Sequence, residues 1–169
     1  MDQPQQRFTE LYDRHYRGVL GYALLRAERQ AAEDVAGETF LIAWRRLREV
    51  PDPALPWLLG VARNLLRKQR DSGLRGQALA TRLADLAPPP EDDVAERVAQ
   101  REAALAALAE LGDQDVEALV LASWYGLTPA EAARVAGCSA KAFAVRLHRA
   151  RRRLSHALDR AALTLEERR

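Results

Sequence analysis

The chain has 169 residues, of which 48% are hydrophobic, and its formal net charge is +2. This composition suits a soluble globular protein with one large or two small packed domains. The single cysteine, Cys138, excludes an internal disulfide and indicates a reducing compartment. Because no leader-like segment or apolar run of membrane length is present, we expect a cytoplasmic protein without membrane insertion.

The sequence carries no recognisable catalytic or metal-binding pattern. Three histidines, His15, His148 and His156, stand without cysteine or carboxylate partners at the spacing of metal ligands. Neither a glycine-rich phosphate loop nor a nucleophile motif occurs. We therefore expect no metal, no cofactor and no enzymatic activity.

The first predicted element is an amphipathic helix over residues 8–27, which follows a disordered polar start. Thr9 is a possible helix cap, and apolar or half-polar side chains recur at helical spacing. The predicted buried side is formed by Leu11, Tyr12, His15, Val19, Tyr22 and Ala23.

Residues 30–47 form the second predicted helix, which has an apolar and an acidic side. Its buried side comprises Val35, Thr39, Phe40, Ile42, Ala43 and Leu47, and its acidic side comprises Glu33, Asp34 and Glu38. Gly37, in the middle, costs up to about 1 kcal/mol relative to alanine. This cost predicts that another group approaches closely at that position.

Two prolines predict a loop over residues 49–55, after which a basic helix extends to residue 70. Its predicted buried positions are Leu58, Val61, Ala62 and Leu65. Its polar side carries Arg63, Arg67 and Arg70 in one stripe, with Asn64 and Lys68 beside it. Trp57 stands at its first turn, where it could stack on unpaired bases while arginines hold the backbone, or equally anchor the core.

Residues 71–93 lack apolar periodicity, contain three consecutive prolines and are net acidic, so they predict a flexible linker. Two further helices follow, over residues 94–111 and 113–125. Asp113 is expected to cap the latter, whose buried side would be Val116, Leu119, Val120 and Trp124. The predicted fold is all-α, with small helical domains at 1–70 and 94–169.

Residues 127–154 have the pattern of a helix-turn-helix. Thr128, Pro129 and Glu131 form a capping-box start with proline in the first turn. Gly137 supplies the left-handed residue that ends the first helix, and Ser139 can cap the second. The second helix is far more basic than the first, as a recognition helix requires.

The second of these helices has an apolar face opposite a basic one. Phe143, Leu147, Ala150 and Leu154 recur at offsets of four, seven and eleven, which predicts a buried face. The other side presents Lys141, Val145, His148, Arg149 and Arg152, flanked by Arg146, Arg151 and Arg153, and includes no acidic residue. Such a face repels itself unless phosphate neutralises it, so we predict binding in the major groove of DNA.

Three segments, in this order, resemble motifs of the extracytoplasmic-function (ECF) class of bacterial sigma-70 factors. Residues 32–44, AEDVAGETFLIAW, resemble the polymerase-binding helix of that class. Trp57-Leu58 and Ala62-Arg63-Asn64 resemble its minus-10 helix, and residues 146–151, RLHRAR, resemble its minus-35 recognition helix. The resemblance covers nearly the whole chain.

The resemblance implies a role for each segment and a set of partners. Polymerase contact, to the beta-prime clamp helices, would fall to Asp34, Glu38, Thr39 and Phe40. Capture of a flipped base of the minus-10 non-template strand would fall to residues 50–55 with Trp57, Arg63, Asn64, Arg67 and Lys68. Reading of the minus-35 duplex would fall to Lys141, Val145, Arg146, His148, Arg149, Arg152 and Arg153. The implied partners are core RNA polymerase, including its beta flap, promoter DNA and an anti-sigma factor.

Two other functions are compatible with parts of the pattern. A helix-turn-helix regulator could bind duplex DNA as a dimer without polymerase, although nothing in the N-terminal part indicates a ligand pocket. A sigma mimic that only sequesters an anti-sigma factor would be free to lose its basic face. The acidic second helix together with the basic recognition helix favours a sigma factor.

Overall fold

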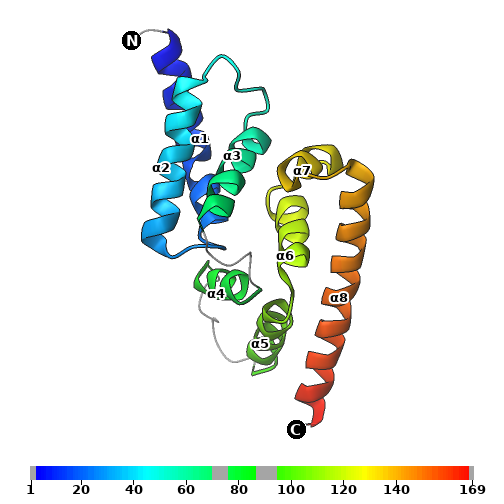
Figure 1. The fold of residues 1–169 in the computed structure, drawn as a ribbon. Coiled ribbons are helices and arrows are strands. Elements are labelled where there is room, and N and C mark those ends of the chain that lie inside the picture. The colour runs from blue at the N-terminus through cyan, green and yellow to red at the C-terminus, as the bar shows by residue number, and fades with distance from the viewer. Residues whose placement is uncertain (1–2, 70–75, 87–94, 168–169) are drawn as a thin grey trace. The chain divides into compact units, whose positions relative to one another are not determined.

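The computed structural model describes residues 3–69, 76–86 and 95–167, which form helices and no strand, as predicted (Figure 1). The α-helices are α1 (Gln3–Ala23), α2 (Arg29–Arg45), α3 (Leu55–Lys68), α4 (Gly76–Leu86), α5 (Ala95–Ala109), α6 (Asp113–Leu119), α7 (Pro129–Ala136) and α8 (Ala140–Glu167). A short π-helical segment, η1 (Val120–Trp124), continues α6.

The first compact unit comprises the described residues of 1–73 and 127–140. Helices α1, α2 and α3 pack on one another around a core that includes Val19, Tyr22, Val35, Leu58 and Leu59. Helix α7 packs on α3 within this unit. The apolar stripes of three amphipathic helices thus meet in one core, which fixes the outward faces of α2 and α3.

Helix α1 begins earlier than the sequence pattern indicates. Gln3 is already helical, so the expected disordered start is wrong from that residue onward. Thr9 lies inside the helix, where its hydroxyl donates to the carbonyl of Gln5 at 2.9 Å, so it is not a cap. A threonine hydroxyl can bond to the carbonyl four residues back, and this keeps it compatible with a helix interior.

The second compact unit comprises the described residues of 74–126 and 141–169. Its helix α4 lies inside the segment predicted to be a linker and packs against α5, where the Arg101 guanidinium donates to the carbonyl of Ala84 at 2.8 Å. The segment predicted as a flexible linker therefore contains a helix at residues 76–86, which the sequence pattern does not predict. The proline and acidic residues at 88–93 lie outside the described residues, and the domain limits at 70 and 94 stay predictions.

Helix α6 and η1 differ from the single helix predicted over residues 113–125. Gly112 occupies the N-cap position without a side-chain bond, so Asp113 is the first helical residue and not the cap. The amide of Tyr125 donates to the carbonyl of Val120 at 3.0 Å, which is the wide turn of a π-helix. This turn shifts the helical phase, and Trp124 is 46% exposed instead of buried.

Candidate nucleic-acid interface

The turn between α7 and α8 has the local chemistry predicted for it. The hydroxyl of Thr128 accepts a hydrogen bond from the amide of Glu131 at 3.2 Å, and Pro129 begins the helix. Gly137 adopts φ +70°, a left-handed conformation that costs a residue with a Cβ about 1–2 kcal/mol. Thr128 and Pro129 therefore fix where α7 begins and Gly137 fixes where it ends, and α8 begins at Ala140.

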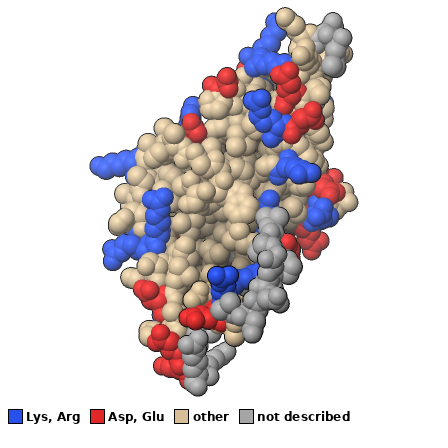
Figure 2. Space-filling model, turned by 180° about the vertical axis from the view of Figure 1, so that it is seen from behind, with Lys and Arg blue, Asp and Glu red and all other residues tan. Residues whose placement is uncertain are grey.

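Helix α8 exposes the basic face that the sequence predicts. Lys141, Val145, His148, Arg149 and Arg152 are all exposed, and Arg146 is half-buried. In Figure 2 the side on which α8 lies shows Lys and Arg side chains toward one end and Asp and Glu side chains toward the other. The basic end is therefore available to an anionic surface such as DNA phosphate.

The opposite face of α8 is buried at three of its four predicted positions, and Leu154, the fourth, is half-buried. Phe143 is 1% exposed, and Leu147 and Ala150 are buried with it. Because these positions repeat every three to four residues, their burial sets the rotation of the helix and directs the basic positions outward.

Arg153 has an intramolecular partner that the sequence pattern does not predict. Its guanidinium donates to both carboxylate oxygens of Asp115 in α6, at 2.9 and 3.0 Å. The side chain of Asp115 is only 9% exposed, so this pair compensates a carboxylate removed from water. Arg160 similarly pairs with Glu110 at 2.8 Å. Arg153 thus helps to hold α8 on α6, and its assignment to DNA stays a prediction.

A cavity of about 380 Å³ opens beside the start of α3. Its walls come from Arg46, the prolines and Asp52 of the loop after α2, Trp57, Gly60, Val61 and Asn64 of α3, and Arg134 of α7. Trp57 is half-buried, and the guanidinium carbon of Arg46 lies 5.8 Å from the centre of its ring. An aromatic wall with a cation above it suits a stacked base with its phosphate.

The rest of α3 places its basic residues along the helix that leads away from this cavity. Asn64, Arg67 and Lys68 are exposed, and Arg63 is half-buried. Arg70, predicted in the same stripe, lies outside the described residues. The structure therefore brings Trp57 and Asn64 together at the cavity, and leaves Arg67 and Lys68 at the far end of α3.

The outward face of α2 differs from its predicted composition. Asp34 and Glu38 are exposed, as expected. Thr39 is fully buried and donates to the carbonyl of Val35 at 2.8 Å, and Phe40 is 2% exposed. Phe40 belongs to the core because the rings of Tyr12 and Tyr16 lie 5.0 and 5.9 Å from its own. Thr39 and Phe40 therefore lie on the buried side of α2, as their helical spacing predicts, and not on the outward face to which the family resemblance assigns them.

An apolar groove of about 610 Å³ occupies this face and was not predicted. It is lined mainly by Phe8 and Tyr12 of α1 and by Gly37, Leu41 and Trp44 of α2. Leu41 and Trp44 are 46% and 41% exposed. The signal was present in the sequence, because positions 37, 41 and 44 repeat at helical spacing beside Asp34 and Glu38.

Comparisons with known proteins match both halves of the chain. The family described as Sigma-70 region 2 matches residues 11–73, and Sigma-70, region 4 matches residues 101–154. The RNA polymerase sigma factor CnrH of Cupriavidus metallidurans is 33% identical and aligns with 92% of this chain and 88% of its own length. The chain belongs to the sigma-70 family, in its ECF class. Membership of this class associates the chain with RNA polymerase in transcription initiation.

Two further relatives of this sigma-family chain differ in length from it. The ECF sigma factor BldN of Streptomyces coelicolor is 33% identical over 89% of this chain and 60% of that protein. The probable sigma factor RfaY of Xanthomonas campestris pv. campestris is 38% identical over 72% of this chain. The matched part of this chain covers 32% of the length of RfaY.

Solved structures show the same fold. CnrH in complex with the cytosolic domain of CnrY superposes with a TM-score of 0.59 and 27% identity, over 92% of this chain and 89% of that chain. RpoE of Bartonella quintana, in complex with the anti-sigma factor NepR, gives a TM-score of 0.61 over 90% of this chain and 96% of that chain. At 20% identity, the second likeness concerns the fold alone.

The described residues contain neither a membrane-spanning helix nor a cluster of metal-binding side chains. Among the described residues, no helix combines the length and the apolar character needed to cross a bilayer. Within the same residues, no three His, Cys, Asp or Glu side chains gather where they could hold a metal ion.

Proposed function

We propose that this chain is an ECF sigma factor that binds core RNA polymerase and directs it to promoters by minus-35 duplex recognition and minus-10 strand capture. The observation that carries the proposal is the presence, in one chain, of an exposed arginine-rich recognition helix and an aromatic-walled cavity. A duplex reader needs the first feature alone. Capture of an unpaired base needs the second as well.

The minus-35 element is read by α8. Lys141, Val145, His148, Arg149 and Arg152 share its exposed face, with Arg146 at the edge. Arg149 lies near the middle of this face, from which a guanidinium can donate two hydrogen bonds to the edge of a guanine. Arg153 holds α8 on Asp115, and its exposed side chain stays at the edge of the proposed DNA surface.

The minus-10 strand is captured at the cavity beside α3. The space of about 380 Å³ accepts one flipped base against Trp57, with Arg46 above the ring and Asn64 on the wall. Arg63, Arg67 and Lys68 extend the positive charge along α3 for the strand backbone. Arg134 of α7 adds a further cation to the cavity wall.

Polymerase binds to the outward face of α2. Asp34 and Glu38 offer negative charge to a basic clamp helix, and the exposed Leu41 offers the apolar area that Thr39 and Phe40 do not. Interfaces of this kind combine a few desolvated apolar or aromatic anchors with a charged rim. Substitution of Leu41 by glutamate should therefore weaken polymerase binding while the buried Phe40 preserves the core.

An anti-sigma factor is the proposed regulatory partner. CnrH and RpoE, which share this fold, were each solved with a bound partner, the cytosolic domain of CnrY and NepR respectively. The groove of about 610 Å³ between α1 and α2 is a concave apolar surface of a size suited to a short amphipathic segment.

A pull-down with core RNA polymerase followed by run-off transcription tests the proposed function. The full chain should bind core polymerase and produce new start sites on genomic templates. A regulator that acts without polymerase would bind duplex DNA but produce neither result, and a sigma mimic would produce no transcript. Leu41→Glu should lose binding, whereas the control Arg17→Ala, an exposed position on α1 outside the cavities, should not.

A further inference from the structure

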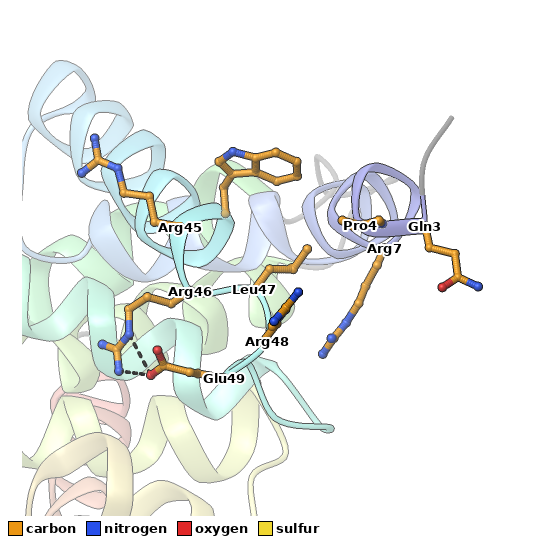
Figure 3. A pocket seen from close by; sticks show the side chains of 9 residues that line it. Gln3, Pro4, Arg7, Arg45, Arg46, Leu47, Arg48 and Glu49 are labelled. Atoms are coloured by element: carbon orange, nitrogen blue, oxygen red, sulfur yellow. Dashed lines mark hydrogen bonds and ion pairs between the residues drawn. The ribbon is translucent and has the colours of Figure 1, made fainter.

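A second cavity, of about 490 Å³, lies between the start of α1 and the turn that follows α2 (Figure 3). The residues that define its chemistry are Arg7, Trp44, Arg45, Arg46, Leu47 and Arg48. In Figure 3 the side chains of Arg7 and Arg48 extend on the same side of the turn, and Arg45 extends on the other side. None of the roles described above uses Arg7, Arg45 or Arg48.

The cavity carries an excess of positive charge. Glu49 is the acidic residue in its lining, and Arg46 bonds to it, which holds the pKa of the Glu49 carboxyl below its usual range. Arg7 donates to the carbonyl of Val50 at 2.9 Å, a bond that positions its guanidinium without neutralising it. Among the described residues, Arg45 and Arg48 have no ion-pair partner. Like charges gathered in this way favour an anion.

The remaining lining is suited to a flat ring. Trp44 is 41% exposed, and its ring is braced by Phe8, whose centre lies 5.2 Å away in an edge-to-face arrangement. Leu47 adds an apolar surface at the same cavity. An exposed indole next to arginines is the combination that binds single-stranded nucleic acid, in which bases stack and phosphates are neutralised.

The two cavities share one lining side chain. Arg46 lines both the cavity at Trp57 and the cavity at Trp44. A strand whose base is held at Trp57 can therefore place a neighbouring nucleotide at Trp44 by passing over Arg46. A free nucleotide would satisfy the same chemistry but would gain nothing from this shared wall.

We propose that the Trp44 cavity binds a nucleotide of single-stranded DNA adjacent to the base captured at Trp57. The base stacks on Trp44, and Arg7 and Arg48 neutralise the backbone phosphate. The proposal rests on the strand capture proposed above and extends it by one binding site. The free energy comes from stacking and phosphate contact, so the site recognises a strand with little dependence on its sequence.

The test uses the full chain and fluorescently labelled single-stranded oligonucleotides, with anisotropy as the measure of affinity. One oligonucleotide contains the minus-10 non-template sequence alone. Two others extend it by three nucleotides at the 5′ or the 3′ end, and matching abasic extensions lack the added bases. We expect one of the two extensions to raise the affinity about tenfold and its abasic form to give only part of that gain.

Three variants separate this proposal from the one on which it rests. Arg48→Ala and Trp44→Leu should abolish the gain from extension and leave the affinity for the short oligonucleotide unchanged. Arg17→Ala removes the same charge from an exposed site and should keep the gain. Asn64→Ala should weaken the short oligonucleotide, and failure of this effect alone would count against the capture site at Trp57.

Two results would overturn the assignment of the Trp44 cavity. The first is an equal gain from extension in the parent chain, Arg48→Ala and Trp44→Leu, or no gain in any of them. The second is loss of the gain in the presence of a matched concentration of free nucleoside triphosphate, because that would identify a small nucleotide as the ligand instead of a strand.

Discussion

Single charged residues divide into those that face solvent and those that maintain the fold. Arg152 and Arg153 are neighbours on α8 and both have exposed side chains, yet only Arg153 bonds to Asp115. The difference arises because successive helical residues point about 100° apart. One arginine can therefore serve DNA while the next stabilises the unit.

Replacement of Arg153 by alanine should lower the free energy of unfolding by about 1–2 kcal/mol, because it leaves the buried carboxylate of Asp115 without its partner. Arg152→Ala removes the same charge from an exposed site and should change stability by less than about 0.5 kcal/mol. Urea denaturation of both variants provides the comparison. Equal losses in the two variants would show that the bond to Asp115 contributes no stability.

Tyr125 predicts a pH dependence of stability in the alkaline range. Burial raises its pKa to about 12, and the nearby Arg82 opposes this only in part. In the unfolded chain tyrosine ionises near pH 10, so between about pH 10 and 12 the unfolded chain holds fewer protons than the folded chain. The free energy of unfolding should therefore fall as pH rises, by about 1.4 kcal/mol at pH 11.

Urea unfolding of the parent chain and of Tyr125→Phe between pH 9 and 11 isolates this contribution. The phenylalanine variant should lack the alkaline loss that Tyr125 causes, so the difference between the two stabilities should change with pH. Two parallel curves would mean that Tyr125 ionises in the folded and the unfolded chain alike.

The burial of a side chain could be predicted from the sequence where helical spacing alone decides it. Phe143, Leu147 and Ala150 were predicted correctly because their spacing defines one buried face. Phe40 was predicted to be buried from periodicity and exposed from the family resemblance, and the aromatic rings of α1 decide in favour of burial. The partner of Arg153 could not be read at all, since Asp115 is 38 residues away in the chain.

Two glycines, Gly137 and Gly37, differ in whether the surrounding helix requires a glycine at that position. Gly137 ends α7 with φ +70°, and a Cβ there would meet a side-chain nitrogen of Arg63 at an ordinary 3.8 Å, so backbone conformation alone requires the glycine. Gly37 lies inside α2, and a Cβ there would meet nothing within 4 Å. The close approach predicted at Gly37 is therefore not made by this chain.

Replacement by alanine should therefore have opposite effects on stability at Gly137 and at Gly37. Gly137→Ala should destabilise the chain by about 1–2 kcal/mol through left-handed strain. Gly37→Ala should stabilise it by about 0.5–1 kcal/mol, because alanine has the higher helix propensity and space is available. Thermal unfolding measures both. If Gly37→Ala also weakens polymerase binding, the absence of a Cβ at this position allows the polymerase to approach closely. Destabilisation by Gly37→Ala would contradict the open space at that site.

Among the elements, the sequence predicted helices with clear periodicity and caps better than those defined by tertiary packing. The bounds of α7 follow from Thr128, Pro129 and Gly137, all of which act locally. Helix α4 has weaker local signals and is stabilised by α5, and the wide turn of η1 leaves no local mark that distinguishes it from an α-helix. Contacts that form only after folding decided both cases.

At the scale of the whole molecule, the proposed function depends on two DNA-binding surfaces with different tasks. In the proposed function the exposed face of α8 offers charge and side chains to a duplex, whereas the cavity at Trp57 is proposed to accept a base that has left its pair. Duplex binding should therefore depend on α8, and strand separation should depend on α3.

Arg149→Ala and Asn64→Ala in reconstituted holoenzyme test this division of labour. Arg149→Ala should weaken promoter occupancy by about 1–3 kcal/mol through loss of one base contact, without changing the fraction of bound promoters that open. Asn64→Ala should leave occupancy nearly unchanged and reduce opening, because its side chain lines the cavity proposed to hold the unpaired base. Nuclease footprinting over the minus-35 element measures occupancy, permanganate reactivity of minus-10 thymines measures opening, and Arg17→Ala controls for loss of an exposed charge. If Asn64→Ala abolished duplex binding while opening stayed proportional to occupancy, strand capture would have to be assigned to residues other than those around Trp57.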